Sequence, residues 1–162
     1  MSYFGPRLGF GCDNIANAEV VLASGKIVNA NSSSNSDLFT ALKGGVNNFG
    51  IVTRYDLKTV PDARFWGGLI EYPPQAIPSQ LAAFTKFKQQ PYDGNAEVEN
   101  TYTYAQGQLF SGNNLFYTKP VSNPQALKVF SDVQPQLVNT QRFSDIANFS
   151  AELASLQASN LR

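Results

Sequence analysis

The fold of the first part of the chain is decided by the stretch Asp37-Leu38-Phe39-Thr40-Ala41-Leu42-Lys43-Gly44-Gly45-Val46-Asn47-Asn48-Phe49-Gly50-Ile51-Val52-Thr53. The spacing of its apolar residues changes at the glycines. Ser36 or Asp37 is suited to cap a short helix, which Gly44-Gly45 then ends. After Gly50, apolar and polar residues alternate until Pro61, which predicts a strand of eight or more residues.

Two apolar runs precede this stretch, at residues 18–23 and 26–30, and Ser24-Gly25 separates them. This spacing is typical of a β-hairpin whose turn uses glycine at positive φ. The predicted order is therefore strand, strand, helix, strand, with glycines in the connections.

The character of the sequence changes at Pro61-Asp62-Ala63, because longer regular runs with fewer glycines follow. We predict a domain boundary there. Beyond it, strands are expected at 65–72, 97–107 and 108–117, and helices at 77–89, from Asn123-Pro124 to Phe130, and at 150–158. Ser111-Gly112-Asn113-Asn114 is expected to form a turn. The repeating face of the helix at 77–89 is expected to consist of Leu81, Phe84 and Phe87 or Lys88.

The composition argues against several classes of function. Twelve basic residues balance twelve acidic ones without a basic run, so nucleic acid is not expected as a partner, and no apolar stretch reaches the roughly 20 residues of a membrane-spanning helix. The chain has one cysteine, Cys12, and no histidine, so we expect no internal disulfide, no metal site and no Ser-His or Cys-His nucleophile. Catalysis would need a cofactor or other side chains.

A second stretch, Ser2-Tyr3-Phe4-Gly5-Pro6-Arg7-Leu8-Gly9-Phe10-Gly11-Cys12-Asp13-Asn14, leads into the predicted hairpin. Together with residues 37–53 it resembles the second half of the PCMH-type FAD-binding domain of berberine bridge enzyme-like oxidases, in the vanillyl-alcohol oxidase superfamily, especially fungal members. The resemblance covers about Ser2 to Pro61 in the family's order of elements. It implies an α+β fold, with the C-terminal part of an FAD-binding domain at 1–61 and part of a substrate-binding domain at 62–162.

The resemblance implies that FAD is the cofactor and that main-chain groups of Gly50, Ile51 and Val52 contact it. Glycine at such a turn lets the main chain approach a flat ring. A glycine turn needed only to start a strand is the alternative. In the family the first stretch runs beside the flavin, which makes further candidates of Tyr3, Gly5, Gly9, Asp13 and Asn14. For Asp13, a role in organising its own turn is equally open.

Members of the family carry an upstream flavin-binding loop, with a histidine that bonds the flavin, and a C-terminal segment that supplies acid-base residues. This sequence contains neither. We therefore expect Met1 to be an internal methionine and the chain to be an interior fragment, and we do not expect these 162 residues to bind FAD alone. Catalytic residues are left unassigned.

In the second part, Tyr102 and Tyr104 fall on one face of a predicted strand, and Glu97 and Glu99 share a face as well. A tyrosine could contact substrate, because one sheet face of this domain covers the flavin in the family. Packing or surface bulk is the interpretation that we favour for the tyrosines. The glutamates are expected to be solvated and are given no chemistry.

The expected function is that of an FAD-dependent oxidoreductase, an oxidase that takes a hydride from a carbinol or amine-bearing carbon of a small organic substrate. Two alternatives stay open. A truncated relative could be a binding or scaffold module that associates with a copy of itself or with a complementary fragment. A redox-neutral cyclase or isomerase could use the same cleft. The sequence selects neither a substrate nor a compartment.

Overall fold

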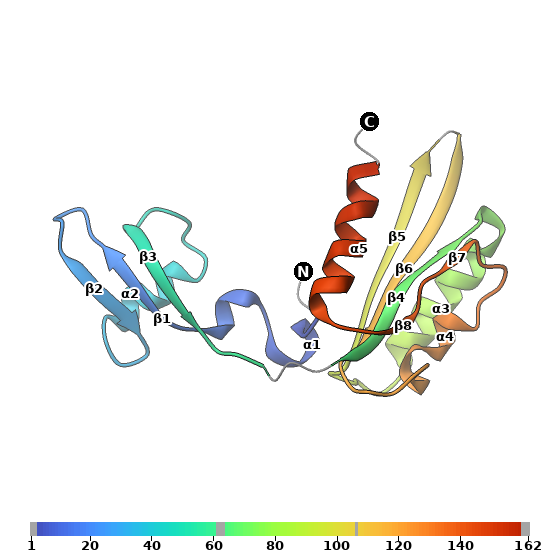
Figure 1. Ribbon diagram of the computed structural model, residues 1–162, viewed down its shortest axis with the longest axis horizontal. Helices are drawn as coiled ribbons and strands as arrows, with labels where there is room; N and C mark the ends of the chain where they lie inside the picture. The colour runs from blue at the N-terminus through green and yellow to red at the C-terminus, as the bar shows by residue number, and fades with distance from the viewer. Residues whose placement is uncertain (1–2, 61–63, 106, 160–162) are drawn as a thin grey trace. The chain divides into compact units, whose positions relative to one another are not determined.

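The computed structural model describes residues 3–60, 64–105 and 107–159, and its contacts divide the chain into two compact units (Figure 1). The small unit is Leu8–Pro61, and the large unit is Asp62–Arg162 together with Tyr3–Arg7. The predicted boundary at Pro61-Asp62-Ala63 lies outside the described residues. Each unit has a hydrophobic core of its own.

The small unit contains, in its described part, a three-stranded antiparallel sheet that a helix covers on one face. Its elements are β1 (Ile15–Val21), β2 (Ile27–Asn31), α2 (Ser36–Leu42) and β3 (Ile51–Leu57), with β1 at the centre of the sheet. The predicted hairpin is confirmed, because β1 pairs with β2 and Gly25 takes a φ of 80° in the turn. The buried core beneath α2 consists of Ala18, Val20 and Ala30.

Two boundaries in the small unit differ from the prediction. The residue before α2 is Asn35, at a φ of 48°, so both predicted cap residues lie inside the helix, which begins at Ser36. The Asn35 side chain donates to a backbone carbonyl of β2 at 2.8 Å and holds this turn. β3 has seven residues rather than eight or more, because its partner β1 begins at Ile15, opposite Leu57.

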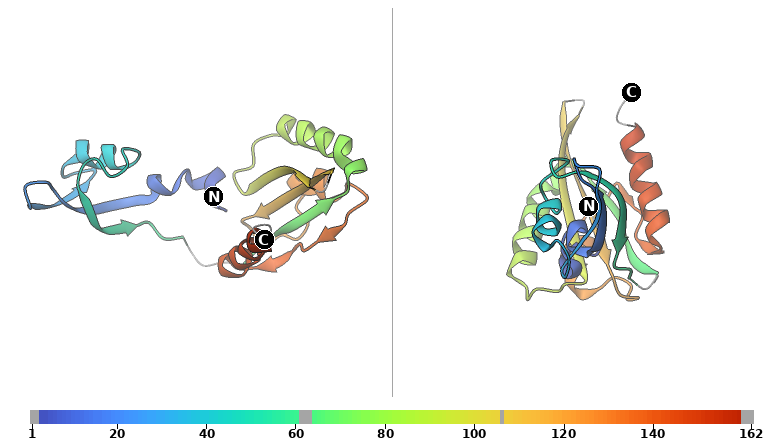
Figure 2. Two further views of the ribbon diagram at one scale, coloured as in Figure 1. Left: turned by 90° about the horizontal axis from the view of Figure 1, so that it is seen from above. Right: turned by 90° about the vertical axis from the view of Figure 1, so that its left-hand side faces the viewer.

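The large unit is built on an antiparallel sheet, which has five strands in the described ranges. These strands are β4 (Phe65–Tyr72), β5 (Ala96–Ala105), β6 (Gln108–Tyr117), β7 (Val138–Asn139) and β8 (Arg142–Ser144). β6 lies between β5 and β4, and β7 and β8 pair with the other edge of β4. α3 (Ile77–Gln89) and α4 (Lys128–Ser131) lie on one face of the sheet, and α5 (Ile146–Ser159) lies on the other (Figure 2).

Strand β6 runs through the residues that were expected to form a turn, 111–114, and the chain turns at Gly107 instead, where φ is 78°. Asn113 is tolerated in this central strand because its side chain finds partners. The buried Asn113 donates to the side-chain oxygen of Gln80 on α3 at 2.6 Å and accepts from Asn100 on β5 at 2.5 Å. These bonds replace the hydrogen bonds to water that an amide loses when it is buried.

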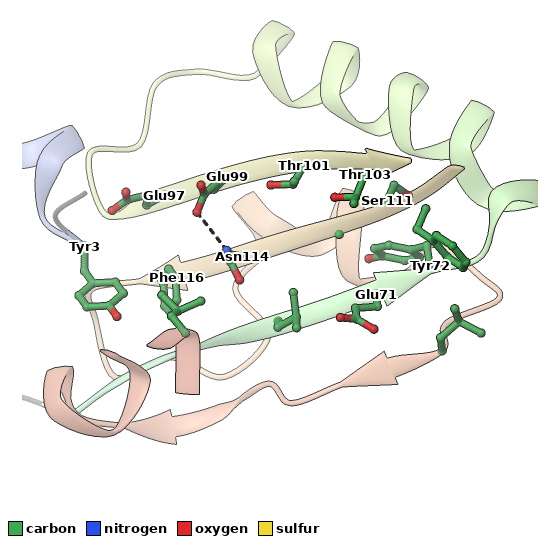
Figure 3. Close-up of a pocket in the computed structure, with 15 residues that line it drawn as sticks. Tyr3, Glu71, Tyr72, Glu97, Glu99, Thr101, Thr103, Ser111, Asn114 and Phe116 are labelled. Atoms are coloured by element: carbon green, nitrogen blue, oxygen red, sulfur yellow. Dashed lines mark hydrogen bonds between the residues drawn. The ribbon is translucent and has the colours of Figure 1, made fainter. Parts of the chain in front are cut away.

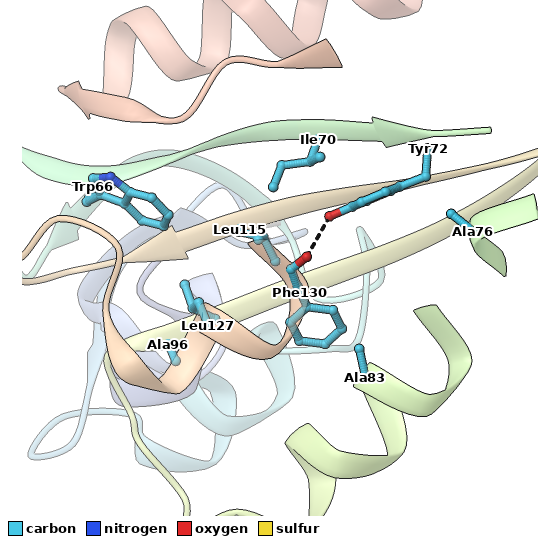
Figure 4. Close-up of a cluster of buried hydrophobic side chains, with 9 residues drawn as sticks. All are labelled: Trp66, Ile70, Tyr72, Ala76, Ala83, Ala96, Leu115, Leu127 and Phe130. Carbon is cyan, nitrogen blue, oxygen red and sulfur yellow. Dashed lines mark hydrogen bonds between the residues drawn. The ribbon is translucent and has the colours of Figure 1, made fainter. Parts of the chain in front are cut away.

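The core of the large unit lies between the sheet and the pair α3 and α4 (Figure 4). Tyr72 of β4 donates its buried hydroxyl to the carbonyl of Phe130 on α4 at 2.9 Å. Burial raises the pKa of Tyr72 to about 12, so the phenol remains a hydrogen-bond donor at all physiological pH values. The other large members of this core are Trp66, Ile70, Leu115 and Leu127.

Helix α3 has the predicted bounds, and Phe87 of the predicted face packs against the core, but the other positions of that face differ. Gln80 and Ala83 are buried, whereas Leu81 and Phe84 of the predicted face are 53% and 40% exposed. The buried Asn113 needs a partner from the helix, and Gln80 supplies it. A polar contact therefore decides the rotation of α3, and an apolar pattern could not reveal it.

The predicted helix that follows Asn123-Pro124 is present in two pieces, a 3₁₀ turn at Gln125–Leu127 and the short α4. α5 begins four residues before the predicted start at Ser150, because the Asp145 carboxylate accepts the main-chain N–H of Asn148 at 2.9 Å and caps the helix. β7 and β8 have no counterpart in the prediction, since runs of two and three residues carry no periodicity. None of the described helices is long and apolar enough to cross a membrane.

Substitution of Gly68 in β4 tests the packing at the edge of the sheet. It has a φ of 147°, and a Cβ there would lie 2.8 Å from the backbone of Thr140 and 2.9 Å from Gln141. We expect Gly68→Ala to lower the free energy of unfolding by about 2–4 kcal/mol, from backbone strain and overpacking together. Denaturant unfolding followed by the fluorescence of Trp66, the single tryptophan, reports on the large unit.

Gly112 of β6 is the matched control. A Cβ there would find its nearest neighbour, a methyl of Leu69, at 3.7 Å, and its φ is not positive. We expect Gly112→Ala to change stability by less than about 1 kcal/mol. Equal effects of the two substitutions would contradict the packing of Gly68 against the segment between β7 and β8.

Candidate functional site

The large unit contains a cavity of about 710 Å³ on the sheet face opposite α3 and α4 (Figure 3). This volume lies in the range of pockets that hold small organic molecules. β4, β5 and β6 contribute most of the lining, and Tyr3, Leu137 and Leu153 complete it. The polar side chains of the lining include three carboxylates, which only accept hydrogen bonds when ionised, together with hydroxyls and an amide, and among them are Glu71, Glu97, Glu99, Thr101, Thr103 and Asn114.

The register of the sheet brings these side chains together. Glu97 and Glu99 on β5 stand opposite Phe116 and Asn114 on β6, and the Asn114 amide donates to Glu99 at 3.0 Å. The next residue of β6 on this face is Gly112, which contributes no side chain and so leaves space above the middle of the sheet. The arrangement follows from side-chain alternation, which sends every second residue of each strand to the same face.

Glu97 is the carboxylate with the most perturbed environment. Burial raises the pKa of Glu97 to about 7, and the nearby Glu99 carboxylate adds to the increase, against the opposing effect of the chain's terminal ammonium. Its Oε2 atom is buried and accepts no hydrogen bond from the described residues, and the same holds for Oδ1 of Asn114. The cavity therefore presents two buried acceptors that a donor on a bound molecule could satisfy.

The expectation for the glutamates was wrong, since Glu97 and Glu99 are not simply solvated but line the cavity. Tyr102 and Tyr104 lie at the alternate positions of β5 and belong to the opposite face, where Tyr102 borders a shallow hollow with side chains of α3. Tyr104 is 73% exposed. A signal for the cavity was present in the sequence, because residues 97, 99, 101 and 103 form an unbroken polar row at every second position.

Tyr3, a predicted cofactor residue, belongs to an aromatic cluster of the large unit. Its ring centroid lies 4.5 Å from that of Phe116, and its hydroxyl lies 3.2 Å from the hydroxyl of Ser150 on α5. Phe65 and Phe149 complete the cluster. Tyr3 thereby joins the N-terminal segment to the cavity wall.

Gly5 begins α1 (Gly5–Leu8), also in the large unit, and a Cβ there would meet no atom within 4 Å. Packing within the described residues does not require glycine at this position. Its prediction as a cofactor residue rests on the family resemblance.

Gly9, Asp13 and Asn14 form a self-contained turn in the small unit. Asp13 accepts the main-chain N–H of Phe10 at 2.9 Å, and Gly9, at a φ of 74°, has no room for a Cβ beside that carboxylate. The Asn14 amide donates to the carbonyls of Leu8 and Phe10, both at 3.0 Å. These contacts support the turn-organising interpretation of Asp13, and a cofactor role for the three residues stays a prediction.

Gly50, Ile51 and Val52 lie where β3 begins. Gly50 has a φ of 137°, and a Cβ there would lie 2.6 Å from the carbonyl oxygen of Val21, so the sheet itself requires glycine. The Ile51 side chain is 71% exposed, and Val52 packs against the core beneath α2. β3 pairs on one side only in the described part of the small unit. An exposed apolar side chain beside an unpaired strand edge fits a flat, polar-edged ring such as a flavin.

The eight predicted cofactor residues are divided between the units, with Tyr3 and Gly5 in the large unit and the other six in the small unit. Their contact with FAD stays a prediction. Within residues 3–60, 64–105 and 107–159, no group of three or more His, Cys, Asp or Glu side chains could hold a metal ion. Cys12 is a free thiol with partial exposure.

A buried carboxyl with a raised pKa makes stability depend on pH. The folded state holds the Glu97 proton more tightly than the unfolded state, so the free energy of unfolding falls as pH rises from about 4.5 to about 7. We expect Glu97→Gln to remove this decrease, which makes the variant more stable than the wild type above about pH 7 and similar to it below pH 4.5. Thermal unfolding followed by Trp66 fluorescence at several pH values checks this.

Glu19→Gln is the control for net charge. Glu19 lies in the small unit, where it accepts from Thr53 at 2.7 Å and pairs with Arg54 at 3.8 Å. Its removal should leave the pH dependence of the large unit unchanged. The same pH profile in Glu97→Gln and in the wild type would show that Glu97 is solvated after all.

The most similar curated relatives are fungal flavoenzymes. An FAD-dependent monooxygenase of Cercospora beticola is 42% identical over 96% of this chain and 32% of its own length. One of Cercospora nicotianae is 41% identical over 96% of the chain and 36% of its length. One of Phaeosphaeria nodorum is 39% identical over 96% of the chain and 51% of its length. The chain thus spans between about a third and a half of these relatives. No protein-family profile matches it.

Solved structures with the same fold confirm the expected α+β class. The 6-hydroxy-D-nicotine oxidase of Arthrobacter nicotinovorans superposes with a TM-score of 0.80 over 96% of this chain and 35% of its own, at 16% identity. A variant of berberine bridge enzyme gives a TM-score of 0.73 over 94% of this chain and 31% of its own, at 16% identity. Along nearly its whole length the chain is therefore similar to fungal FAD-dependent monooxygenases, and it has the fold of FAD-linked oxidases such as berberine bridge enzyme.

Proposed function

We propose that this chain contributes cofactor-binding and substrate-binding surfaces to an FAD-dependent oxidoreductase that acts on a small organic substrate. The observation that carries the proposal is the 42% identity to an FAD-dependent monooxygenase along 96% of the chain. The cavity of the large unit supports it, because its volume and its mixture of carboxylate, amide and aromatic groups suit a small organic molecule.

The division of labour follows the two units. The small unit is proposed to be the C-terminal part of the FAD-binding domain, with the main chain at Gly50–Val52 against the cofactor. Residues 62–162 are proposed to form part of the substrate-binding domain, with the cavity as the substrate site. Bound FAD supplies the redox chemistry, and the side chains of this chain bind and orient the substrate and accept its proton.

The fold alone does not select the substrate. Neighbours with TM-scores of 0.80, 0.71 and 0.67 are named as oxidases of 6-hydroxy-D-nicotine, of chitooligosaccharides and of xylooligosaccharides. Substrate choice in this protein must therefore come from the side chains of its own cavity.

The cofactor proposal is tested on the natural protein that carries this sequence. We expect it to be purified with a flavin chromophore that is visible in its absorption spectrum. We further expect Ile51→Gln to weaken FAD binding by about tenfold, because a polar group replaces an exposed apolar contact at the start of β3. Titration of the flavin-free protein with FAD, followed by flavin fluorescence, measures the change.

Ile27→Gln is the matched control. Ile27 on β2 is 62% exposed and stands in the same row of the sheet as Ile51, with Val21 between them. It lies at the opposite edge of the sheet and should leave FAD affinity unchanged. A colourless protein that releases no flavin would overturn the proposal, and equal losses in the two variants would overturn the assigned position.

A second candidate function, association with another polypeptide, has one observation in its favour. Ile27, Val21 and Ile51 form an apolar row on the sheet face away from α2, and the two isoleucines are largely exposed. If this row is an interface, the purified chain should self-associate, and Ile27→Gln and Ile51→Gln should each convert it to a monomer. Size-exclusion chromatography with light scattering checks this, and a monomeric wild type would count against association with a second copy.

A further inference from the structure

We propose that Glu97 is the specificity-determining and proton-accepting residue of the cavity, and that it selects a ring compound carrying a hydroxyl or ammonium group over an anionic one. The inference rests on the proposed function only in taking the cavity as the substrate site. It names the chemistry of the substrate, which neither the fold nor the relatives supply.

The charge of the lining favours donors and disfavours anions. Glu71, Glu97 and Glu99 line the cavity, and none of the described residues that line it is Lys or Arg. The nearest cationic side chain on this face, Arg142, is already paired with Glu152 at 2.6 Å and lies over the ring of Phe149 at 5.0 Å. A carboxylate or phosphate on a ligand would find three carboxylates and no cationic side chain among the described lining residues, whereas a hydroxyl or ammonium would find acceptors.

The aromatic side chains beside Glu97 favour a ring as the body of the ligand. Phe116 stands directly opposite Glu97 on β6, and the Tyr3 ring packs edge-on against Phe116 at 4.5 Å. Both side chains line the cavity, and Leu153 of α5 adds an aliphatic contact. A planar ring bound there would pack against these side chains with its substituent directed at the carboxylate.

Of the two neighbouring carboxylates, Glu97 has the free acceptor. Oε2 of Glu99 is occupied by the Asn114 amide at 3.0 Å, whereas Oε2 of Glu97 is buried and accepts no bond from the described residues. A buried acceptor without a donor is unfavourable, so a ligand donor at this position would be stabilised more than at Glu99. Glu99 then acts as a positioning residue, through its negative charge and its bond to Asn114.

The groups that face Glu97 influence the pKa of its carboxyl group. Glu99 on β5 is the anionic neighbour, Glu71 lines the cavity from β4, and Tyr3 and the chain's terminal ammonium come from the N-terminal segment. From β6 only the uncharged Asn114 and Phe116 contribute, and Glu152 of α5 is neutralised by Arg142. Burial is the largest influence and raises the pKa of Glu97 to about 7.

The proton transfer follows from this titration. Above about pH 7 the Glu97 side chain is ionised, and as the substrate reacts the carboxylate accepts the proton of the bound O–H or N⁺–H group and becomes a neutral carboxylic acid. The ligand keeps its bonding electrons and its charge falls by one. No oxidant or reductant is involved in this step.

The direct test uses the 162-residue chain with ¹³C-labelled glutamate carboxyl groups, without any flavin. The carboxyl signal of Glu97, assigned by its loss in Glu97→Gln, is followed by NMR from about pH 5 to about pH 9. Three probes are added separately: 2-phenylethylamine, catechol and phenylacetate. We expect the amine and catechol to shift the Glu97 signal and phenylacetate to leave it unchanged.

The amine and catechol distinguish the two donor chemistries. A bound ammonium stabilises the carboxylate and should lower the titration midpoint of Glu97, whereas neutral catechol should displace the signal with a smaller effect on the midpoint. A response to the amine alone assigns an ammonium substrate, and a response to catechol alone assigns a hydroxylated ring. Binding of phenylacetate as tight as that of the other probes would overturn the proposal, as would no response to either donor.

Substitutions distinguish the contribution of Glu97 to binding from the contributions of its neighbours. Glu97→Gln should weaken binding of the donor probe by about tenfold above pH 7 and abolish the pH dependence of binding. Glu99→Gln should keep that pH dependence but move its midpoint to lower pH, because a repulsive charge is lost. Glu19→Gln in the small unit should leave the affinity for the donor probe and the pH dependence of binding unchanged. Retention of the pH dependence by Glu97→Gln would overturn the assignment, whereas the flavin experiments above would be unaffected.

Discussion

Antiparallel pairing of β5, β6 and β4 in a single register is the constraint on which the large unit depends. Side chains alternate between the faces of a sheet, so the register that sets Leu115 beside Val98 in the core also sets Asn114 beside Glu99 in the cavity. A slip by one residue would exchange the contents of the two faces. The buried hydrogen bonds of Asn113 oppose such a slip, because its partners are available in one arrangement only. The core and the cavity are therefore two results of the same pairing.

The cavity obtains its chemistry from segments that lie far apart in the sequence. β5 supplies Glu97, β6 supplies Phe116, and the N-terminal segment supplies Tyr3. The aromatic contacts among Tyr3, Phe116 and Phe149 hold the N-terminal segment and α5 beside the sheet. Burial produced by this packing also raises the pKa of Glu97, so the contacts that stabilise the unit also perturb this carboxyl group.

In the small unit, structural and functional demands fall on the same residues. Gly50 must be glycine because β1 passes too close for a Cβ, and Asp13 and Asn14 are used in their own turn. A glycine that the fold requires is weak evidence for a cofactor by itself. Ile51 is different, since its large apolar side chain is 71% exposed at a strand edge and is not part of the buried core of this unit. The case for FAD therefore depends on the fungal relatives and on Ile51 more than on the glycines.

The sequence by itself indicated the resemblance to FAD-dependent enzymes, the α+β class and the bounds of its most periodic elements, including β4 and α3, because these depend on local patterns and on linked residues between Ser2 and Pro61. It misplaced part of the buried face of α3 and the turn in β6, since the pairing of Gln80 with Asn113 joins residues 33 positions apart. Only the tertiary structure decided that Glu97 is buried in a cavity. A carboxylate on a strand has the same sequence pattern whether its face meets water or an aromatic wall, and its environment is set by segments that the local pattern does not contain.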